Sequence, residues 1–423
     1  MKVLLVCNTA LPEIEKKYHL AASKPESWLL GHVAALGKVP GVQIAMCFPI
    51  RPHQESITAV IDDIRYYSYV RYPDMLSYSD ATEQEFADIF KKEMPDIIHA
   101  FGTEFVHTLA AVNAARKCGM IHKLVISIQG LVSMCGGYHY YAGLPPYAVC
   151  ARTIRDVLKR DSIRKQRNGF VRRGEFEKEA IRKAVHIIGR TDWDHACVTQ
   201  INPNIHYHFC NETLRESFYE HHWSLDACEK HSIFVSQANY PLKGFHKMLE
   251  AMALIVKKYP DARLYTTGVD PTQAKTFLKK QRQTYYMRYL AQKIQKLGLE
   301  GNVVFTGYLE EKAMCERFCK SHVFVSPSSI ENSPNSLGEA MLLGVPCVAS
   351  DVGGVKNLMR HNEDGFIYPF DEPYMLAYYV DKIFSGDDLA QSLSEKAKAH
   401  AAVTHHRKIN ADRMMQIYKD ICS

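Results

Sequence analysis

The sequence has no long uninterrupted run of apolar residues. Its longest apolar stretch, residues 340–350, is broken by Gly344 and Pro346, whereas a helix needs about 20 apolar residues to span a bilayer. At the N-terminus only five apolar residues lie between Lys2 and Asn8, which is short for a signal peptide and typical of a buried strand. We therefore expect a cytoplasmic chain without a leader or a membrane span.

The sequence also lacks paired cysteines. None of its twelve cysteines forms a CxxC motif, so neither a zinc ribbon nor a disulfide framework is expected, and a reducing compartment is favoured. Cys315, Cys319 and His322 have ligand-like spacing. No fourth ligand lies near them in the sequence, and the stretch has the pattern of an amphipathic helix, so a structural role is favoured over metal binding.

Two nucleotide-binding motifs are absent as well. No GxGxxG follows the first expected strand, and no GxxxxGK[ST] occurs anywhere in the chain. These glycine-rich loops hold the pyrophosphate of dinucleotides and the phosphates of P-loop substrates. The sequence therefore gives no support to a nicotinamide-dependent dehydrogenase or a P-loop phosphotransferase.

Positive charge is concentrated in one segment. The chain has a net charge of +6, and residues 151–183 alone carry twelve Lys/Arg and five Asp/Glu, a local charge of +7. Apolar residues such as Leu158, Phe170 and Val171 are interleaved with these cations. The segment is either a solvated helix face or a surface for anionic lipid headgroups. A nucleic-acid partner is not expected, because no recognised binding module accompanies the charge.

Short β-branched runs alternate with helical patterns along the whole chain, which predicts an α/β fold with parallel sheets covered on both faces. The alternation occurs twice, separated by a polar stretch around residues 211–230. We expect two Rossmann-like, doubly wound domains facing across a cleft. The expected strands are 3–7, 43–48, 97–100, 124–128, 186–189, 233–236, 263–267, 303–306, 323–326 and 347–350, and the expected helices include 246–258, 272–297 and 310–320.

Two glutamates flank an expected helix start in the segment IENSPNSLGEAM, residues 330–341. Ser333 is a suitable cap, and Pro334 fits the first helical turn. The amides of such a terminus favour a phosphate or diphosphate, and at 1.5 Å per residue the two carboxylates would be roughly 8–12 Å apart. A nucleotide-sugar would fit this gap. The amides expected to face it belong to Asn335, Ser336 and Leu337.

This pattern is similar to a known family. Glu331 and Glu339 form E-x₇-E, and the following EAMLLGVPCVASDVGG resembles the retaining GT-B glycosyltransferases of family four. NVVFTGYLEEKAM, SIFVSQANYPLKGFHKMLEAM and DGFIYPFD resemble other segments of its donor-binding half. DIIHAFGTEF, VISIQGL and GRTDWD are similar to the branch that builds capsular and exopolysaccharide repeat units. The resemblance implies an acceptor domain at residues 1–215, a donor domain at 216–403, and a C-terminal helix at 404–423 that crosses back to the first domain.

The resemblance also implies roles for individual residues on the donor side. Glu331 would contact the donor sugar and Glu339 the ribose, while Lys243 would bind the diphosphate. Gly307 lies in the turn before the donor site. The family usually has an arginine five or six residues before the lysine, where this chain has Ala238 and Gln237.

On the acceptor side, the candidates are Gln129, Glu104 and Arg190, of which Arg190 could replace the missing arginine from across the cleft. The implied partners are a nucleotide-sugar, linked to UDP or GDP, and a glycan or polyprenyl-diphosphate-linked acceptor, with no metal required. If the basic segment 151–183 binds anionic lipid headgroups, the chain would be peripheral on the inner face of the cell membrane.

Alternatives remain for both the motifs and the function. Asp192 and Asp194 form a DxD, but Thr191 before them predicts a helix cap, with Asp194 at the third helical position. His206 and His208 alternate on an expected strand and are interpreted as structural. A nucleotide-sugar epimerase of the same architecture would explain the same domains. So would a catalytically weak partner subunit, which the missing arginine favours.

Overall fold

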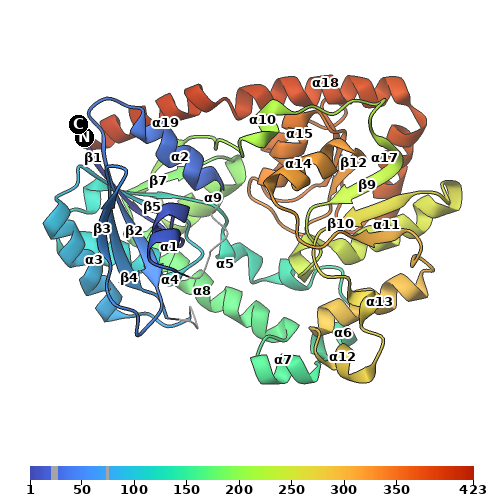
Figure 1. Ribbon diagram of the computed structural model, residues 1–423, viewed down its shortest axis with the longest axis horizontal. Helices are drawn as coiled ribbons and strands as arrows, with labels where there is room; N and C mark the ends of the chain where they lie inside the picture. Colours follow the sequence, from blue (N-terminus) through green and yellow to red (C-terminus); the bar gives the residue numbers. More distant parts are fainter. Residues whose placement is uncertain (21–26, 73–75) are drawn as a thin grey trace. The chain divides into compact units, whose positions relative to one another are not determined.

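The computed structural model describes residues 1–20, 27–72 and 76–423, which form two compact units (Figure 1). The first unit comprises Met1–Met134, Phe170–Leu214 and His405–Ser423, and the second comprises Cys135–Gly169 and Arg215–Thr404. Each unit contains its own sheet with helices packed against it. The α/β class expected from the alternating pattern is confirmed.

The first unit is built on an eight-stranded sheet. Its strand order is β3-β4-β2-β1-β5-β6-β7-β8, and all pairs are parallel except the β3–β4 hairpin. β1 lies in the middle, so the chain moves outward from it in both directions. The strands are β1 (Lys2–Val6), β2 (Gln43–Ile50), β3 (Thr58–Ile61), β4 (Ile64–Val70), β5 (Ile97–Phe101), β6 (Leu124–Ser127), β7 (His186–Gly189) and β8 (His206–Phe209).

Alternation along β1 explains why helices cover both faces of this sheet. Leu4 belongs to one buried cluster and Leu5 to the other, because successive side chains of a strand point to opposite faces. The helices of this unit are α1 (Pro12–Lys17), α2 (Ser27–Gly37), α3 (Asp80–Glu93), α4 (Val106–Lys117), η1 (Ile121–Lys123), α5 (Val132–Cys135), α9 (Asp192–Ile201) and α19 (Arg407–Cys422). α8 (Ile163–Lys183) begins in the second unit and ends in the first.

The C-terminal helix α19 packs in the first unit. Met414, Ile417 and Tyr418 are buried in the same core cluster as Leu5. Tyr418 Oη also lies 2.6 Å from His99 Nδ1 on β5. Ile409, in the first turn of this helix, is 56% exposed. The buried apolar side chains of this helix therefore begin at Met414, one turn after the buried Asn410.

The second unit contains a six-stranded sheet that is parallel throughout. Its order is β11-β10-β9-β12-β13-β14, with β9 inside the sheet. The strands are β9 (Glu229–Val235), β10 (Arg263–Thr266), β11 (Val303–Phe305), β12 (Ser321–Ser326), β13 (Cys347–Ser350) and β14 (Phe366–Tyr368). The helices are η2 (Tyr138–Tyr141), α6 (Pro146–Cys150), α7 (Ile154–Lys159), α10 (Ser217–Glu220), η3 (Pro241–Lys243), α11 (Phe245–Lys258), η4 (Pro271–Gln273), α12 (Phe277–Gln281), α13 (Tyr285–Lys296), α14 (Glu311–Cys319), α15 (Asn335–Leu343), α16 (Val355–Leu358), α17 (Pro373–Ser385) and α18 (Asp387–Thr404).

Residues 135–169 differ from the domain boundaries that the sequence predicted. They were expected in the N-terminal domain, but they cluster with the second unit. Specific bonds hold them there: His246 Nε2 lies 2.9 Å from the Ala142 carbonyl oxygen, and Ser329 Oγ donates to the His139 carbonyl at 2.8 Å. These partners are more than a hundred residues away in sequence, so no local pattern indicates them.

Two secondary-structure expectations also need correction. The expected helix over residues 272–297 is divided, because the side chains of Thr276 and Thr284 each accept a hydrogen bond from a backbone amide and start a new helix. The β3–β4 hairpin was not expected. It turns at Asp62 and Asp63, both with positive φ, as two-residue hairpin loops require.

None of the helices within the described residues has the length and apolarity to cross a bilayer.

Candidate functional site

The strand order of the second unit places two loops at one edge of its sheet. From β9 the chain first adds β10 and β11 on one side, and later β12, β13 and β14 on the other. In doubly wound sheets, ligands bind outside the carboxyl ends of the strands at such a reversal. The loop after β9 carries Lys243, and the loop after β12 carries Glu331. The topology thus brings together two residues that are 88 positions apart in sequence.

Lys243 and Glu331 form an ion pair. Lys243 Nζ lies 2.6 Å from Glu331 Oε1, and the same oxygen accepts a hydrogen bond from Ser328 Oγ at 2.7 Å. The two side chains remain 24% and 14% exposed. Burial lowers the pKa of the Lys243 ammonium, but Glu331 and Tyr240 raise it further than burial lowers it. The net pKa therefore lies above its ordinary value, and the cation stays charged.

Two glycines fix the backbone on either side of this ion pair. Gly244 follows Lys243 with φ +63°, and a Cβ there would lie 1.7 Å from the Pro327 carbonyl oxygen. Gly353 has φ +51°, and a Cβ there would lie 1.9 Å from the Glu331 carbonyl oxygen. The amide of Gly354 donates to that same carbonyl at 3.1 Å. The glycine pair after β13 therefore sets the position of Glu331.

Glu339 is buried inside α15, with its carboxylate held by Arg215. Arg215 Nε and Nη2 donate to Oε1 and Oε2 of Glu339, each at 2.6 Å. Burial raises the pKa of Glu339, and the opposing effect of Arg215 does not fully offset it. Each carboxylate oxygen has two lone pairs, so a ligand hydroxyl can still bind. Arg215 was not predicted from the sequence, because it lies in a polar stretch without a motif.

The N-terminus of α15 differs in detail from the expected one. The helix begins at Asn335, Pro334 occupies the cap position, and no side chain caps it, so Ser333 is not the cap. The amide of Leu337 donates to the Pro334 carbonyl at 3.0 Å and is not directed at a ligand. The amides of Asn335 and Ser336 belong to the first turn, where N–H groups lack partners within the helix.

Gly307, the remaining donor-side candidate, follows β11. It has φ +75°, which glycine adopts without strain. It forms a bridge with Gly268, whose amide donates to the Gly307 carbonyl at 2.9 Å. The bridge lies just beyond the paired ends of β10 and β11. Gly307 therefore turns the chain at the carboxyl edge of the second sheet.

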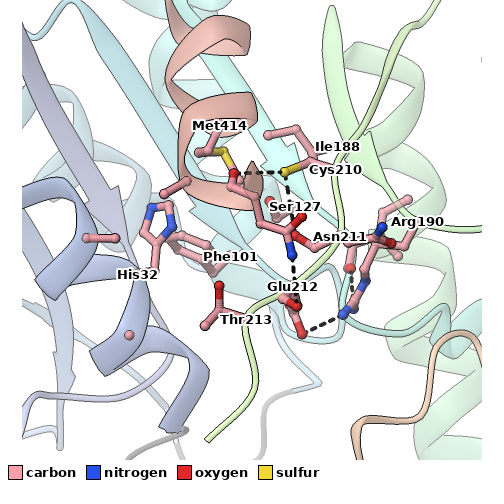
Figure 2. A pocket seen from close by; sticks show the side chains of 15 residues that line it. His32, Phe101, Ser127, Ile188, Arg190, Cys210, Asn211, Glu212, Thr213 and Met414 are labelled. Atoms are coloured by element: carbon pink, nitrogen blue, oxygen red, sulfur yellow. Dashed lines mark hydrogen bonds and ion pairs between the residues drawn. The ribbon is translucent and has the colours of Figure 1, made fainter. Parts of the chain in front are cut away.

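The first unit places one acceptor-side candidate, Arg190, in a pocket (Figure 2), and a second, Gln129, contacts the pocket residue Glu212. Arg190 Nη1 lies 2.5 Å from Glu212 Oε2, and Gln129 Nε2 donates to Glu212 Oε1 at 2.5 Å. Only 5% of the Arg190 side chain is exposed. Arg190 is thus paired within the first unit, and its proposed role as a second diphosphate cation stays a prediction. Glu212, which connects the two candidates, was not predicted.

Other polar groups line the same pocket, which encloses about 50 Å³. They come from distant parts of the chain and include His32, Ser127, Asn211, Thr213 and Asn410 (Figure 2). Ser127 is held by His99, whose Nε2 lies 2.7 Å from its Oγ. These hydroxyl, amide and charged groups can both donate and accept hydrogen bonds.

Glu104 lies close to this pocket in the same unit. A Cβ placed on Gly102 would lie 2.2 Å from Glu104 Oε2 and 3.8 Å from Gln129 Cγ. Gly102 has φ +78°, so the turn after β5 leaves room for the carboxylate. The three acceptor-side candidates thus follow three neighbouring strands, β5, β6 and β7, at their carboxyl ends.

Comparison with known proteins agrees with this geometry. The family model for "Glycosyl transferases group 1" matches residues 220–400. The whole chain superimposes on sucrose-phosphate synthase from Thermosynechococcus elongatus with a TM-score of 0.67 at 16% identity, covering 100% of this chain and 99% of that one. The chain has the GT-B fold, and its residues 220–400 are similar to the group 1 glycosyltransferases.

Other GT-B proteins match over most or all of the chain. Anabaena HepE in complex with UDP-glucose has a TM-score of 0.67 at 15% identity, covering 99% of this chain and 100% of that one. N-acetyl-alpha-D-glucosaminyl L-malate synthase of Bacillus anthracis is 21% identical over 85% of this chain and 81% of its own length. The uncharacterized glycosyltransferase MJ1607 of Methanocaldococcus jannaschii is 26% identical over 192 residues. The aligned part spans 45% of MJ1607, and 43% of YtcC from Bacillus subtilis.

The DxD of this GT-B chain is a helix cap. Thr191 Oγ1 accepts the amide of Asp194 at 3.0 Å, and the buried Asp194 carboxylate accepts the Arg190 amide at 2.9 Å. The capping interpretation is confirmed. His206 and His208 pack beside His186 on adjacent strands, with ring centroids 5.3 Å apart. Within the described residues, no group of three or more His, Cys, Asp or Glu is arranged to hold a metal ion.

Proposed function

We propose that the chain transfers a hexosyl group, with retention of configuration, from a nucleoside-diphosphate donor to a hydroxyl of a glycan acceptor. The carrying observation is the Lys243–Glu331 ion pair at the reversal point of the second sheet. The similarity of residues 220–400 to the group 1 glycosyltransferases supports a nucleotide-sugar donor. HepE bound to UDP-glucose and a trehalose-6-phosphate protein bound to UDP-2-fluoro glucose share the fold, which favours UDP over GDP.

In the proposed reaction, the bond between the anomeric carbon and the diphosphate oxygen breaks, and the acceptor oxygen bonds to the same carbon. The acceptor hydroxyl loses its proton, which the departing diphosphate takes up. Negative charge therefore grows on the diphosphate while the sugar becomes electron-poor. Groups that stabilise this charge in the transition state accelerate the reaction.

Lys243 supplies the positive charge in this proposal. An opposite charge at about 4 Å is worth about 4 kcal/mol at an effective dielectric of 20. Lys243 is already paired with Glu331, at 2.6 Å. The diphosphate would become a second partner of Lys243, while Glu331 would accept hydrogen bonds from the donor sugar. Glu339, held by Arg215, would accept hydrogen bonds from the ribose.

We propose that these groups suffice without a metal ion. The amides of Asn335 and Ser336 lie at the positive end of α15, and Lys243 adds a full charge. Together they would neutralise much of the diphosphate. Transfer activity that persists in excess EDTA is the expected result.

The acceptor is proposed to bind in the first unit, through the pocket lined by Arg190 and Glu212, whose Glu212 carboxylate also binds Gln129. Its mixture of donors and acceptors fits sugar hydroxyls. Resemblance to the branch that makes capsules and exopolysaccharides favours a glycan carried on polyprenyl diphosphate. Surface polysaccharide synthesis is the process in which we place the reaction.

The direct test incubates the full chain with a panel of UDP- and GDP-linked sugars, with and without polyprenyl-diphosphate-linked glycans. We expect nucleoside diphosphate to be released at an acceptor-dependent rate, with the sugar recovered on the glycan. An isomerised nucleotide-sugar without release would instead identify an epimerase. Donor binding without turnover by any pair would favour a partner subunit. Either outcome would overturn the proposal.

A further inference from the structure

The basic segment at residues 151–183 is not one continuous surface. In the second half of α8 several cations already have partners: Lys178 pairs with Glu175 at 3.0 Å and Lys183 with Glu179 at 2.6 Å, while Arg173 lies over the Phe170 ring at 4.5 Å. The first part of the basic segment, which contains α7, belongs to the second unit. This part contacts a second segment that is also basic and apolar, around α12.

Two short helices of the second unit expose large apolar side chains to solvent. On α7, Leu158 is 77% exposed, and Ile154 and Val157 are 54% and 58% exposed. On α12, Phe277 is 67% exposed and Leu278 is 68% exposed. Single exposed apolar residues are ordinary, but a group of five on two adjoining helices is typical of an interaction surface.

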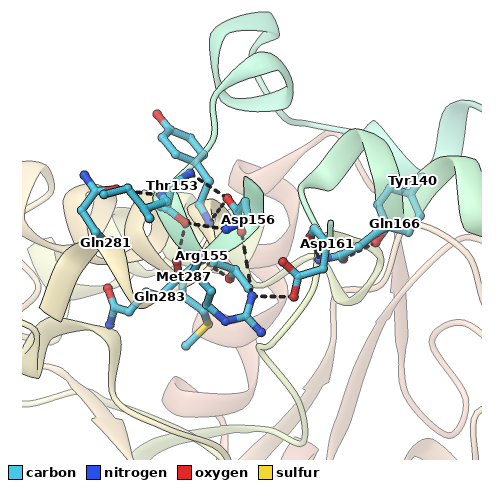
Figure 3. A network of polar contacts seen from close by, with 12 residues as sticks. Tyr140, Thr153, Arg155, Asp156, Asp161, Gln166, Gln281, Gln283 and Met287 are labelled. Atoms are coloured by element: carbon cyan, nitrogen blue, oxygen red, sulfur yellow. Dashed lines mark hydrogen bonds and ion pairs between the residues drawn. The ribbon is translucent and has the colours of Figure 1, made fainter. Parts of the chain in front are cut away.

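A polar network joins these helices into one structure (Figure 3). Thr153 Oγ1 donates to the Gln283 carbonyl at 2.7 Å, and the Ile154 amide donates to Gln281 Oε1 at 3.0 Å. The buried Asp156 carboxylate accepts the Tyr285 amide at 2.9 Å. α7 is thereby tied to both ends of the α12–α13 connection. We call α7 and α12 together the α7–α12 plate.

Cations surround the apolar side chains of the α7–α12 plate. Residues 151–161 contain four Lys/Arg and two Asp, and residues 275–282 contain four Lys/Arg and no acid, so the sum is +6. Both aspartates lie beside Arg155, Asp161 at 2.5 Å and Asp156 at 3.9 Å. The other seven cations are exposed: Arg152, Lys159, Arg160, Lys275, Lys279, Lys280 and Arg282.

We propose that the α7–α12 plate docks the chain on a membrane that contains anionic lipids. Apolar side chains such as Leu158, Phe277 and Leu278 would enter the boundary between headgroups and acyl chains, and the cations around them would contact the anionic headgroups. Charge complementarity selects this partner, because exposed cations and exposed apolar groups occur on the same two helices. The proposal is independent of the transfer reaction, since it is tested by binding alone.

The test is co-sedimentation of the full chain with vesicles of equal parts phosphatidylcholine and phosphatidylglycerol, at low and raised salt, against phosphatidylcholine alone. Wild type is expected to bind the anionic vesicles, less at raised salt. Neutralising two cations, Lys279→Gln with Lys280→Gln, should weaken binding roughly twenty-fivefold, because each cation is worth about fivefold. Phe277→Ser with Leu278→Ser removes apolar surface without changing charge and should weaken binding about tenfold or more.

Matched controls come from the opposite end of the second unit's sequence. Lys396→Gln with Lys398→Gln removes two exposed cations of α18, and Val403→Ser replaces a side chain that is 70% exposed. Both controls should bind as wild type does. Equal vesicle binding by the plate variants and wild type would overturn the proposal, as would failure of wild type to bind. A wild-type dimer that Phe277→Ser with Leu278→Ser converts to a monomer would also overturn it, since the plate would then be a subunit interface.

Discussion

Lys243 Nζ lies 2.6 Å from Glu331 Oε1, across two loops that leave neighbouring strands of the second sheet. Lys243 is the last residue of η3, and Gly244 follows it. Glu331 is held through its backbone carbonyl by the glycine pair at 353–354. Backbone contacts on both sides therefore hold the two members of this ion pair in position. It gives the site a charged lysine and an oriented carboxylate at the same point.

Glu331→Gln should act mainly on turnover. A hydrogen bond to a charged group is worth about 1.5–3 kcal/mol, so we expect kcat to fall roughly ten- to a hundredfold. Steady-state kinetics with varied donor measures this. Glu250→Gln is the control, since Glu250 also pairs with a lysine, at 2.6 Å, within the second unit. A kcat equal to that of wild type in Glu331→Gln would show that this carboxylate does not bind the donor sugar in the transition state.

Glu339→Gln should act mainly on donor binding. Ribose contacts are similar in the ground and transition states, so we expect a higher KM for the donor and a kcat within a few-fold of wild type. The glutamine side chain retains one oxygen that can accept a hydrogen bond from Arg215, which limits structural damage. Arg215→Ala is a separate stability test: it leaves the buried Glu339 without its partner and should cost about 3–5 kcal/mol in the free energy of unfolding. An unchanged KM in a stably folded Glu339→Gln protein would contradict the ribose assignment.

Gly353→Ala should disturb Glu331 without touching its side chain. The new Cβ would lie 1.9 Å from the Glu331 carbonyl oxygen, at a backbone φ of +51°. We expect a loss of more than about 2 kcal/mol in the free energy of unfolding and a fall in kcat in whatever protein remains folded. Gly301→Ala is the matched control, because no atom lies within 4 Å of the Cβ it would gain. Similar thermal midpoints for the two variants would refute this account of the glycine.

The stability of the first unit should depend on pH through Glu177. Burial raises the pKa of this carboxyl from 4.5 to about 7, despite hydrogen bonds from Ser133 and Thr103. A raised pKa in the folded state means that the contribution to stability is complete below about pH 4.5 and is lost as the pH rises through 7. The loss amounts to about 3 kcal/mol.

Urea unfolding at about pH 5 and about pH 8 measures this change. In Glu177→Gln the decrease between the two pH values should be smaller than in wild type, because the amide does not titrate. Glu179→Gln, on the same helix and 45% exposed, should behave as wild type does. Equal decreases in Glu177→Gln and wild type would show that Glu177 is not the titrating group.

Much of the fold follows from local patterns in the sequence. The buried strands and the first-unit cap at Thr191 depend on neighbours within a few residues, and they were predicted close to their observed positions. The donor-side glutamates and Lys243 were identified through a resemblance, and the sheet topology then explains why Lys243 and Glu331 meet.

Features that depend on distant partners were not predicted. Arg215 binds Glu339 from 124 positions away, and Glu212 binds Gln129 from 83 positions away. Residues 135–169 join the second unit through similarly distant bonds. Only one part of the α7–α12 plate was predicted, the basic segment that includes residues 151–161. The other cations of the plate lie on and around α12, more than a hundred residues later in the sequence.

Calorimetric titration of UDP and GDP into wild type and Lys243→Ala tests the central claim most directly. If Lys243 binds the donor diphosphate, at least one nucleotide should bind wild type, and its Kd should increase roughly ten- to a hundredfold in the variant. Lys258→Ala, which removes another paired lysine of the second unit, 2.6 Å from Asp381, should leave the Kd unchanged. Equal affinity of a folded Lys243→Ala protein and wild type for both nucleotides would contradict the account.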